Sequence, residues 1–344
     1  MIETATTPLR IVSIGGGNGL STLLRGLKRY ARPESGGVEI TAIVTVTDDG
    51  GSSGRLRREL DVLPPGDIRN CMVALSEDET LLAKLFQYRF TSGAGLKGHS
   101  FGNLFLSAMT GLTGDFAQAV KLSSEVLAVS GRIFPSTAAN VVLEATLADG
   151  RKLAGETRIS RSTAPIARVT MRPRRAKPLP EALEAIANAD LITMGPGSLF
   201  TSVIPNLLVD GIPQAIAKSA ARKAYFVNLM TQPGETTRFR ASDHVKAVLN
   251  HSGGVGKRLV DVCVVNTRAY SRKALESYGR QAAQPVDVDM DELKGMGLKV
   301  VATDLLRMHG RKAEEKIRHD SGTLAAVAIE MAQLGRRAKR RLAS

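Results

Sequence analysis

The chain has 344 residues, of which 43% are hydrophobic and 23% charged, a composition typical of a globular protein rather than a disordered one. Lys and Arg exceed Asp and Glu by 47 to 33, which gives a net charge of +14, and five of these charges stand between Arg336 and Arg341. Two cysteines exclude a disulfide framework or a thiolate metal cage, and no apolar run approaches the roughly 18 residues of a membrane span.

The N-terminal part of the chain has the pattern of a parallel sheet. Residues 10–14 are a short apolar run typical of a buried strand, and Gly15 ends it. Residues 40–46 form a second run rich in β-branched side chains. Between the two runs, leucines recur at helix spacing: Leu20, Leu23, Leu24 and Leu27. A strand, a turn, a helix and a second strand in this order predict an α/β fold.

The second half of the chain repeats this alternation. Buried strands are predicted at 190–194, 224–229, 260–265 and 298–302, and helices at 181–189, 242–250 and 322–334. We therefore expect one large α/β domain over 9–334. It should contain a mostly parallel sheet with helices on both faces, followed by a basic C-terminal tail over 335–344.

One segment departs from the parallel pattern. Residues 141–147 alternate, Asp149 and Gly150 offer a hairpin turn, and residues 166–171 resemble another strand. These features predict a small antiparallel β insertion over about 131–172. A basic stretch with three prolines follows over 172–180, and we expect it to be a surface connection.

Two glycine-rich loops follow predicted strands and precede predicted helices. The first is Gly15, Gly16, Gly17, Asn18 and Gly19. Glycine lets the backbone approach a ligand closely, and the free amides at a helix start favour an anion such as phosphate. The spacing fits neither the dinucleotide fingerprint nor a Walker A loop, and an empty glycine turn is the alternative.

The second glycine loop contains Gly195, Gly197 and Ser198, directly after the predicted strand at 190–194. Hydroxyl groups follow in this loop, and one of them could instead cap the next helix. Loops at the carboxyl ends of neighbouring parallel strands face one crevice. The two glycine loops could therefore hold a diphosphate from two sides.

An acidic and basic segment follows the second strand. Asp48 and Asp49 could accept hydrogen bonds from ribose hydroxyls or hold a divalent cation, and Arg55 could meet a phosphate. The alternative is a polar turn, because Asp, Gly and Ser are common turn residues. None of the five histidines has zinc-ligand spacing, so we expect no metal site of that kind.

Six collinear motifs carry a resemblance to a known family. They are 14–21 (IGGGNGLS), 46–56 (VTDDGGSSGRL), 64–71 (PPGDIRNC), 98–104 (GHSFGNL), 195–208 (GPGSLFTSVIPNLL) and 230–236 (MTQPGET). Together they resemble the YvcK-type gluconeogenesis factors of bacteria, which share a superfamily with the 2-phospho-L-lactate transferase CofD. The resemblance covers about residues 10 to 330.

The resemblance implies a Rossmann-like fold and a cytoplasmic protein that binds UDP-sugars such as UDP-N-acetylglucosamine or UDP-glucose. It also implies a need for the protein in cell shape and wall synthesis during gluconeogenic growth. A tyrosine and an arginine of the C-terminal part matter for nucleotide-sugar binding in the family, and by local pattern these are Tyr278 and Arg318. Asp48 and Asp49 match an acidic pair of the transferase branch, which suggests Mg²⁺ there.

We therefore expect a nucleotide-sugar-binding regulatory factor, with partners among the cell-wall synthesis proteins and a homo-oligomeric state. The enzymatic alternative is a CofD-like transferase in which Asp48 and Asp49 hold Mg²⁺ for phosphoryl or nucleotidyl transfer. A third class is a basic adaptor that uses the tail from Arg336 to Arg341. Nine Phe, five Tyr and no Trp offer few stacking platforms, so no nucleic-acid partner is expected.

Overall fold

A computed structural model describes residues 7–31, 37–76, 81–162, 164–307 and 316–343. Its centre is a seven-stranded sheet in which every adjacent pair of strands is parallel. The strand order is β10-β9-β8-β7-β1-β2-β3. The strands are β1 (Leu9–Gly15), β2 (Val38–Val44), β3 (Arg132–Pro135), β7 (Leu191–Met194), β8 (Arg222–Phe226), β9 (Val262–Asn266) and β10 (Lys299–Thr303). This confirms the predicted parallel α/β fold.

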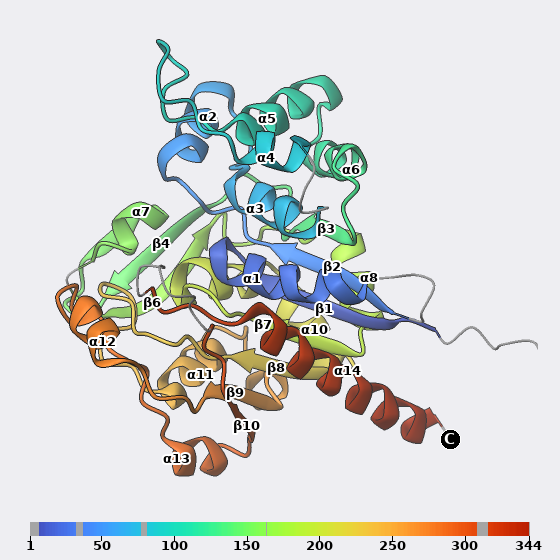
Figure 1. The fold of residues 1–344 in the computed structure, drawn as a ribbon, viewed down its shortest axis with the longest axis vertical. Coiled ribbons are helices and arrows are strands. Elements are labelled where there is room, and N and C mark those ends of the chain that lie inside the picture. Colours follow the sequence, from blue (N-terminus) through green and yellow to red (C-terminus); the bar gives the residue numbers. More distant parts are fainter. Residues whose placement is uncertain (1–6, 32–36, 77–80, 163, 308–315, 344) are drawn as a thin grey trace, which may run out of the picture.

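Helices cover both faces of this sheet (Figure 1). On one face lie α1 (Gly17–Leu27), α3 (Gly66–Leu75) and α14 (Ser321–Ala343). On the other lie α8 (Pro180–Asn188), α9 (Ile204–Leu207), α10 (Ile212–Lys218), α11 (Ala241–Asn250) and α13 (Met290–Gly295), whereas α12 (Arg272–Gly279) stands apart from both faces, beyond the carboxyl ends of the strands. The leucine face predicted for α1 is fully buried at Leu20, Leu23, Leu24 and Leu27, so this helix anchors the core.

A cluster of helices stands beyond the β3 end of the sheet (Figure 1). It contains α2 (Gly51–Leu60), α4 (Leu81–Gln87), α5 (Phe101–Thr113) and α6 (Phe116–Val126). Phe86 of α4 is fully buried against Phe101 and Phe105 of α5. Ser100 caps α5, because its hydroxyl accepts a hydrogen bond from the Asn103 N–H. The cluster is therefore tied together by aromatic packing beside α3.

The small antiparallel sheet has the order β5-β4-β6. Its strands are β4 (Val142–Leu147), β5 (Lys152–Ala154) and β6 (Ile166–Arg172), with the short helix α7 (Glu156–Ile159) between the last two. The insertion thus exists, but its start differs from the predicted position near 131. Residues Arg132–Pro135 form β3, which pairs with β2 at the edge of the main sheet. An unpaired edge on β2 accepts this short strand, a long-range pairing that local sequence does not specify.

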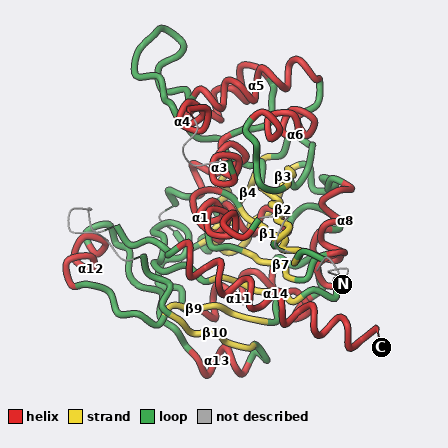
Figure 2. Tube along the Cα trace, turned by 45° about the vertical axis from the view of Figure 1, so that its right-hand side comes forward, coloured by secondary structure: helices red, strands yellow, loops and turns green. Residues whose placement is uncertain are grey.

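The basic C-terminal segment is also different from the expected tail. Helix α14 continues to Ala343, and Arg336 reaches the buried carboxylate of Asp190, with Nη2 at 2.5 Å from Oδ2. Lys339 lies 3.7 Å from the other oxygen of the same carboxylate. Arg336 also donates to the carbonyls of Thr7 and Pro8, so the start of the described chain and the last part of α14 lie on one side of the molecule (Figure 2). A buried carboxylate is costly without a cationic partner, so the pairing of Asp190 with Arg336 and Lys339 stabilises this part of the helix.

No single helix within the described ranges combines the length and the apolar composition needed to cross a membrane. Two bent neighbours, Leu199–Leu207 and Ile212–Lys218, meet that criterion only when they are taken together across a 75° bend.

Candidate functional site

The two glycine loops meet at the point where the chain changes direction through the sheet. Strands β1 and β7 are adjacent and parallel, and the helices that follow them lie on opposite faces. In open α/β sheets this switch point forms a crevice at the carboxyl ends of the strands. A Cβ added at Gly19 would collide with the carbonyl of Pro196, and one at Gly197 would lie 3.4 Å from the carbonyl of Gly16. Only glycine fits where the loops touch.

The first loop presents the start of α1 without a capping side chain. Gly17 has a φ of +61°, a conformation that favours glycine, and a Cβ at Gly16 would lie 2.5 Å from Oδ2 of Asp67. The amides of a helix's first turn have no acceptor within the helix, and the helix dipole adds positive character there. The Gly17 N–H donates to the Asp67 carboxylate. The amides of Asn18 and Gly19 complete this first turn.

The second loop is held by side chains that follow β8. The Gly197 N–H donates to Oδ1 of Asn228 at 3.1 Å, and Nδ2 of Asn228 donates to the Gly197 carbonyl at 2.8 Å. Nε2 of Gln232 donates to the Ser198 hydroxyl at 2.8 Å. Sequence reasoning missed both amide side chains. The signal that could have identified them is their position after a buried strand, the same signal that identified the glycine loops.

Both loops line a cavity of about 370 Å³. Besides Gly16, Gly17, Asn18, Gly19, Gly197 and Ser198, its lining includes side chains from distant segments: Asp67, Glu156, Asn228, Gln232, Tyr278 and His319. No Lys or Arg is among the lining residues in the part of the chain that the structure describes. Its volume lies within the roughly 300–1,000 Å³ of typical small-molecule sites.

Two of the lining residues are carboxylic acids that the sequence did not identify. Burial and the nearby Asp48 carboxylate raise the pKa of Asp67 to about 7, although the Gly17 N–H and Arg69 oppose this rise. Burial and the neighbouring carboxylates of Asp67 and Asp48 raise the pKa of Glu156 well above its usual range. Perturbed carboxyl groups in a cleft are typical of functional sites, because stabilising their charged form requires a cation or a hydrogen-bond donor.

Tyr278 and the segment around residue 318 close the other side of the cavity. The Tyr278 hydroxyl donates to the carbonyl of Ile317 at 3.4 Å, and both residues line the cavity. His319 lines it too, and burial lowers the pKa of His319 to about 4, so this imidazole is neutral at pH 7. Arg318 is exposed and is not among the lining residues. Tyr270, the neighbouring tyrosine, instead donates to the Leu229 carbonyl at 2.9 Å.

Gly15 and Gly195 are not among the lining residues, and three further predicted site residues contact different parts of the molecule and do not line the cavity either. Asp49 accepts hydrogen bonds from the Thr157 N–H at 2.8 Å and from its hydroxyl at 2.6 Å. Asp48 accepts from the Gly50 N–H at 2.9 Å and acts on the cavity through its charge. Arg55 donates to the Lys97 carbonyl at 2.8 Å. Asp49 therefore connects the loop that follows β2 of the main sheet to α7, the helix between β5 and β6 of the small sheet.

Two carboxylates, those of Asp67 and Glu156, are the acidic groups of the cavity that could hold a metal ion. Within the described ranges, no group of three or more His, Cys, Asp or Glu side chains is arranged to hold a metal ion. Asp67 and Glu156 would leave several coordination positions for oxygen atoms of a ligand. That is the arrangement Mg²⁺ prefers, since it is commonly bound through one or two carboxylates together with phosphate oxygens.

Comparisons with known proteins place the chain in one family. A family model described as 2-phospho-L-lactate transferase CofD matches residues 11–306. The chain is 48% identical over 322 residues to the gluconeogenesis factor of Bacillus subtilis, covering 94% of this chain and 98% of that protein. It is 49% identical over 314 residues to the gluconeogenesis factor of Halalkalibacterium halodurans, with coverages of 89% and 95%.

A solved structure has the same fold. The crystal structure of protein BH3568 from Bacillus halodurans matches with a TM-score of 0.88 at 46% sequence identity. The match covers 94% of this chain and 100% of that one.

Proposed function

The chain belongs to the CofD family, and on that premise we propose that its cavity binds a UDP-sugar and that the protein is a regulatory factor of gluconeogenic growth. The observation that carries the proposal is the direct contact of two glycine loops at the switch point of the sheet, beside the start of α1, where Gly16 as N-cap residue has no side chain to bond the first-turn amides. A diphosphate is the ligand group that such paired amide donors favour.

Each part of a UDP-sugar has suitable partners around this cavity. The first-turn amides of Asn18 and Gly19 and the hydroxyl of Ser198 would donate to the diphosphate. The ring of Tyr278, which lies beside Ile317, would stack on the uracil base. The side-chain amide of Asn228, beside the second glycine loop, would meet hydroxyl groups of the sugar.

A divalent cation would reconcile the two cavity carboxylates with a doubly charged ligand. We expect Asp67 and Glu156 to hold Mg²⁺ against the diphosphate, where the ion would neutralise the negative charge on both sides. The raised pKa values of these acids favour their protonated forms when no cation is present. Binding of the ion should therefore release protons, which a titration in two buffers of different ionisation enthalpy would detect.

The cellular role follows from the chemistry of the ligand. UDP-N-acetylglucosamine supplies precursors of the cell wall, so occupancy of the cavity would report sugar supply to the proteins that build the wall and set cell shape. Such a factor needs two states that bind the ligand with different affinity, because a ligand that binds both states equally shifts nothing. Regulation therefore predicts a conformational difference between free and bound protein.

Calorimetric titration with UDP-N-acetylglucosamine in the presence of Mg²⁺ tests the proposal. Wild-type protein should bind saturably, and Gly19→Ala should bind at least tenfold more weakly, because the added methyl group would push the loop from Pro196. Gly111→Ala is the matched control: this glycine is exposed on α5, and a Cβ there meets nothing within 4 Å. Ser198→Ala, a smaller change, should weaken binding without affecting folding.

Two outcomes would reject the proposal. One is the absence of saturable binding by folded wild-type protein at millimolar ligand. The other is equal affinity of Gly19→Ala, Ser198→Ala and Gly111→Ala, all with cooperative thermal unfolding, because the diphosphate would then not touch the glycine loops.

A further inference from the structure

Half of the excess positive charge of the chain lies in and around the small sheet. Residues 131–177 contain ten Lys and Arg against three Asp and Glu, a net charge of +7 out of +14. Two of the three acids are paired with arginines of the same segment: Glu144 with Arg172 at 3.2 Å and Asp149 with Arg151 at 2.7 Å. The third acid, Glu156, lines the cavity between the glycine loops instead. The remaining cations of this segment have no acid within it to balance them.

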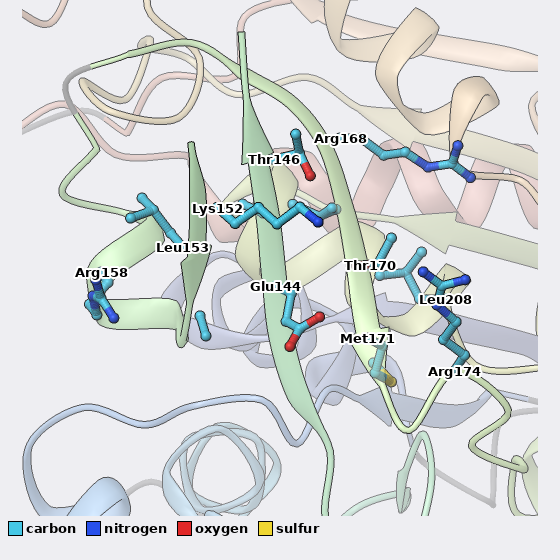
Figure 3. Close-up of a pocket in the computed structure, with 13 residues that line it drawn as sticks. Glu144, Thr146, Lys152, Leu153, Arg158, Arg168, Thr170, Met171, Arg174 and Leu208 are labelled. Atoms are coloured by element: carbon cyan, nitrogen blue, oxygen red, sulfur yellow. The ribbon is translucent and has the colours of Figure 1, made fainter. Parts of the chain in front are cut away.

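Four of these cations surround a second cavity of about 610 Å³ on the small sheet (Figure 3). Lys152 comes from β5, Arg158 from α7, Arg168 from β6 and Arg174 from the connection that follows β6. All four side chains are exposed. None of them forms an ion pair or a side-chain hydrogen bond with another residue in the described ranges. In Figure 3 the Lys152 side chain extends across β4 toward the strand that carries Arg168.

The register of the sheet explains why these charges face each other. Thr146 of β4 pairs with Lys152 on one side and with Arg168 on the other, so the three residues form one row across the sheet. Residues directly opposite each other in a sheet project from the same face. Two cations in one row repel each other, and folding alone gains nothing from that arrangement. A bound anion would remove the repulsion.

The shape of the cavity restricts the anion to a small molecule. Its volume lies within the roughly 300–1,000 Å³ of small-molecule sites. No aromatic side chain is among its lining residues in the described part of the chain, so it offers no platform for a nucleobase. Thr146 and Thr170 place hydroxyl groups between the cations. Glu144 lies in the centre, where it could accept a hydrogen bond from a ligand hydroxyl (Figure 3).

We propose that this cavity is a second ligand site, which binds a small non-aromatic polyanion carrying two or more phosphate groups. The groups would be bound by Arg158 at one edge of the cavity, by Arg168 and Arg174 at the opposite edge, and by Lys152, whose side chain reaches between them (Figure 3). Arginine suits this role because its planar guanidinium can donate two parallel hydrogen bonds to a phosphate. This site is separate from the cavity between the glycine loops, with which it shares no lining residue.

Calorimetric titration with inorganic tripolyphosphate tests this site without any nucleotide sugar present. The decisive comparison is between two double variants that remove the same charge from the same segment. Arg168→Gln/Arg174→Gln removes two cavity cations, whereas Arg161→Gln/Arg175→Gln removes two exposed arginines that do not line the cavity. We expect wild-type protein and the second variant to bind alike within about twofold at 150 mM salt, and the first variant to lose at least tenfold in affinity. Because all four arginines are exposed, neither variant should unfold, and thermal unfolding checks this.

Three outcomes would overturn the proposal. Equal losses in both double variants would show a diffuse electrostatic effect rather than a site. No saturable binding of tripolyphosphate to wild-type protein would show that the cations attract no small polyanion. Tighter binding of a single-stranded oligonucleotide than of tripolyphosphate at the same salt, lost in the first variant, would assign the surface to nucleic acid instead.

Discussion

Replacing Asp67 with Asn should stabilise the protein relative to wild type, and this gain in stability should be larger at alkaline pH than at acidic pH. The Asp67 carboxyl is half-buried, lies near the Asp48 carboxylate, and accepts a hydrogen bond from the Gly17 N–H. An asparagine keeps the acceptor oxygen for that N–H and removes the charge. The substitution therefore isolates the electrostatic cost of one buried carboxylate beside the glycine loop.

The size of the effect follows from the pKa of Asp67. This pKa rises from 3.8 to about 7 on folding, so the unfolded state releases its proton first and wild-type stability falls as pH rises between these values. At 1.36 kcal/mol per pH unit, the full difference corresponds to roughly 4 kcal/mol, of which roughly 3 kcal/mol arises between pH 5 and pH 8. With an unfolding entropy of about 2.1 cal/mol/K per residue, this is a change of roughly 4 °C in Tm.

The assay is thermal or chemical unfolding of wild type and Asp67→Asn at pH 5 and pH 8, without Mg²⁺. The advantage of the variant should grow between the two pH values. Asp210→Asn, which removes an exposed carboxylate elsewhere, should show no such growth. The free energies of unfolding of wild type and Asp67→Asn could instead change by the same amount between pH 5 and pH 8. In that case the ionised Asp67 carboxylate does not destabilise the folded protein, and the reasoning is refuted.

Substitutions at three further positions test separate parts of the structure. Tyr278→Phe should keep most of the affinity for UDP-N-acetylglucosamine and Tyr278→Ala should lose at least fivefold, because in the proposed complex the ring rather than the hydroxyl would contact the base; equal losses in a calorimetric titration would contradict this. Thr157→Val should lower the free energy of unfolding by about 2 kcal/mol in urea, since Asp49 loses one charged hydrogen bond. Arg336→Ala should cost about 3 kcal/mol by leaving the buried carboxylate of Asp190 with weaker partners, whereas an exposed arginine of the same helix should cost almost nothing.

Local periodicity was sufficient to predict most of the main sheet. The helix predicted at 181–189 is observed at Pro180–Asn188, and the strand predicted at 298–302 is observed at Lys299–Thr303. The helix buries one face at Ala182, Ala185 and Ile186, and the edge strand is recognisable from its run of β-branched residues although it is only partly buried. The edge strand Arg132–Pro135 was assigned to the wrong sheet, because its partner β2 lies about ninety residues earlier and only the folded chain brings them together.

The glycine loops of the candidate site could be predicted from the sequence. The side chains that distant segments contribute to it could not. The two glycine loops can be identified in the sequence, because glycine between a strand and a helix is required for their close approach. Asp67 and Glu156 each begin a helix, and in sequence they look like ordinary first-turn acids. Only their common position on one cavity, with raised pKa values, distinguishes them.

The most direct measurement of the central proposal is the crystal structure of the protein with UDP-N-acetylglucosamine and Mg²⁺. The diphosphate should lie within hydrogen-bonding distance of the Asn18 and Gly19 amides and the Ser198 hydroxyl, with the uracil against Tyr278. A ligand bound elsewhere, with the space between residues 15–19 and 195–198 filled only by solvent, would contradict the assignment of that crevice as the nucleotide-sugar site.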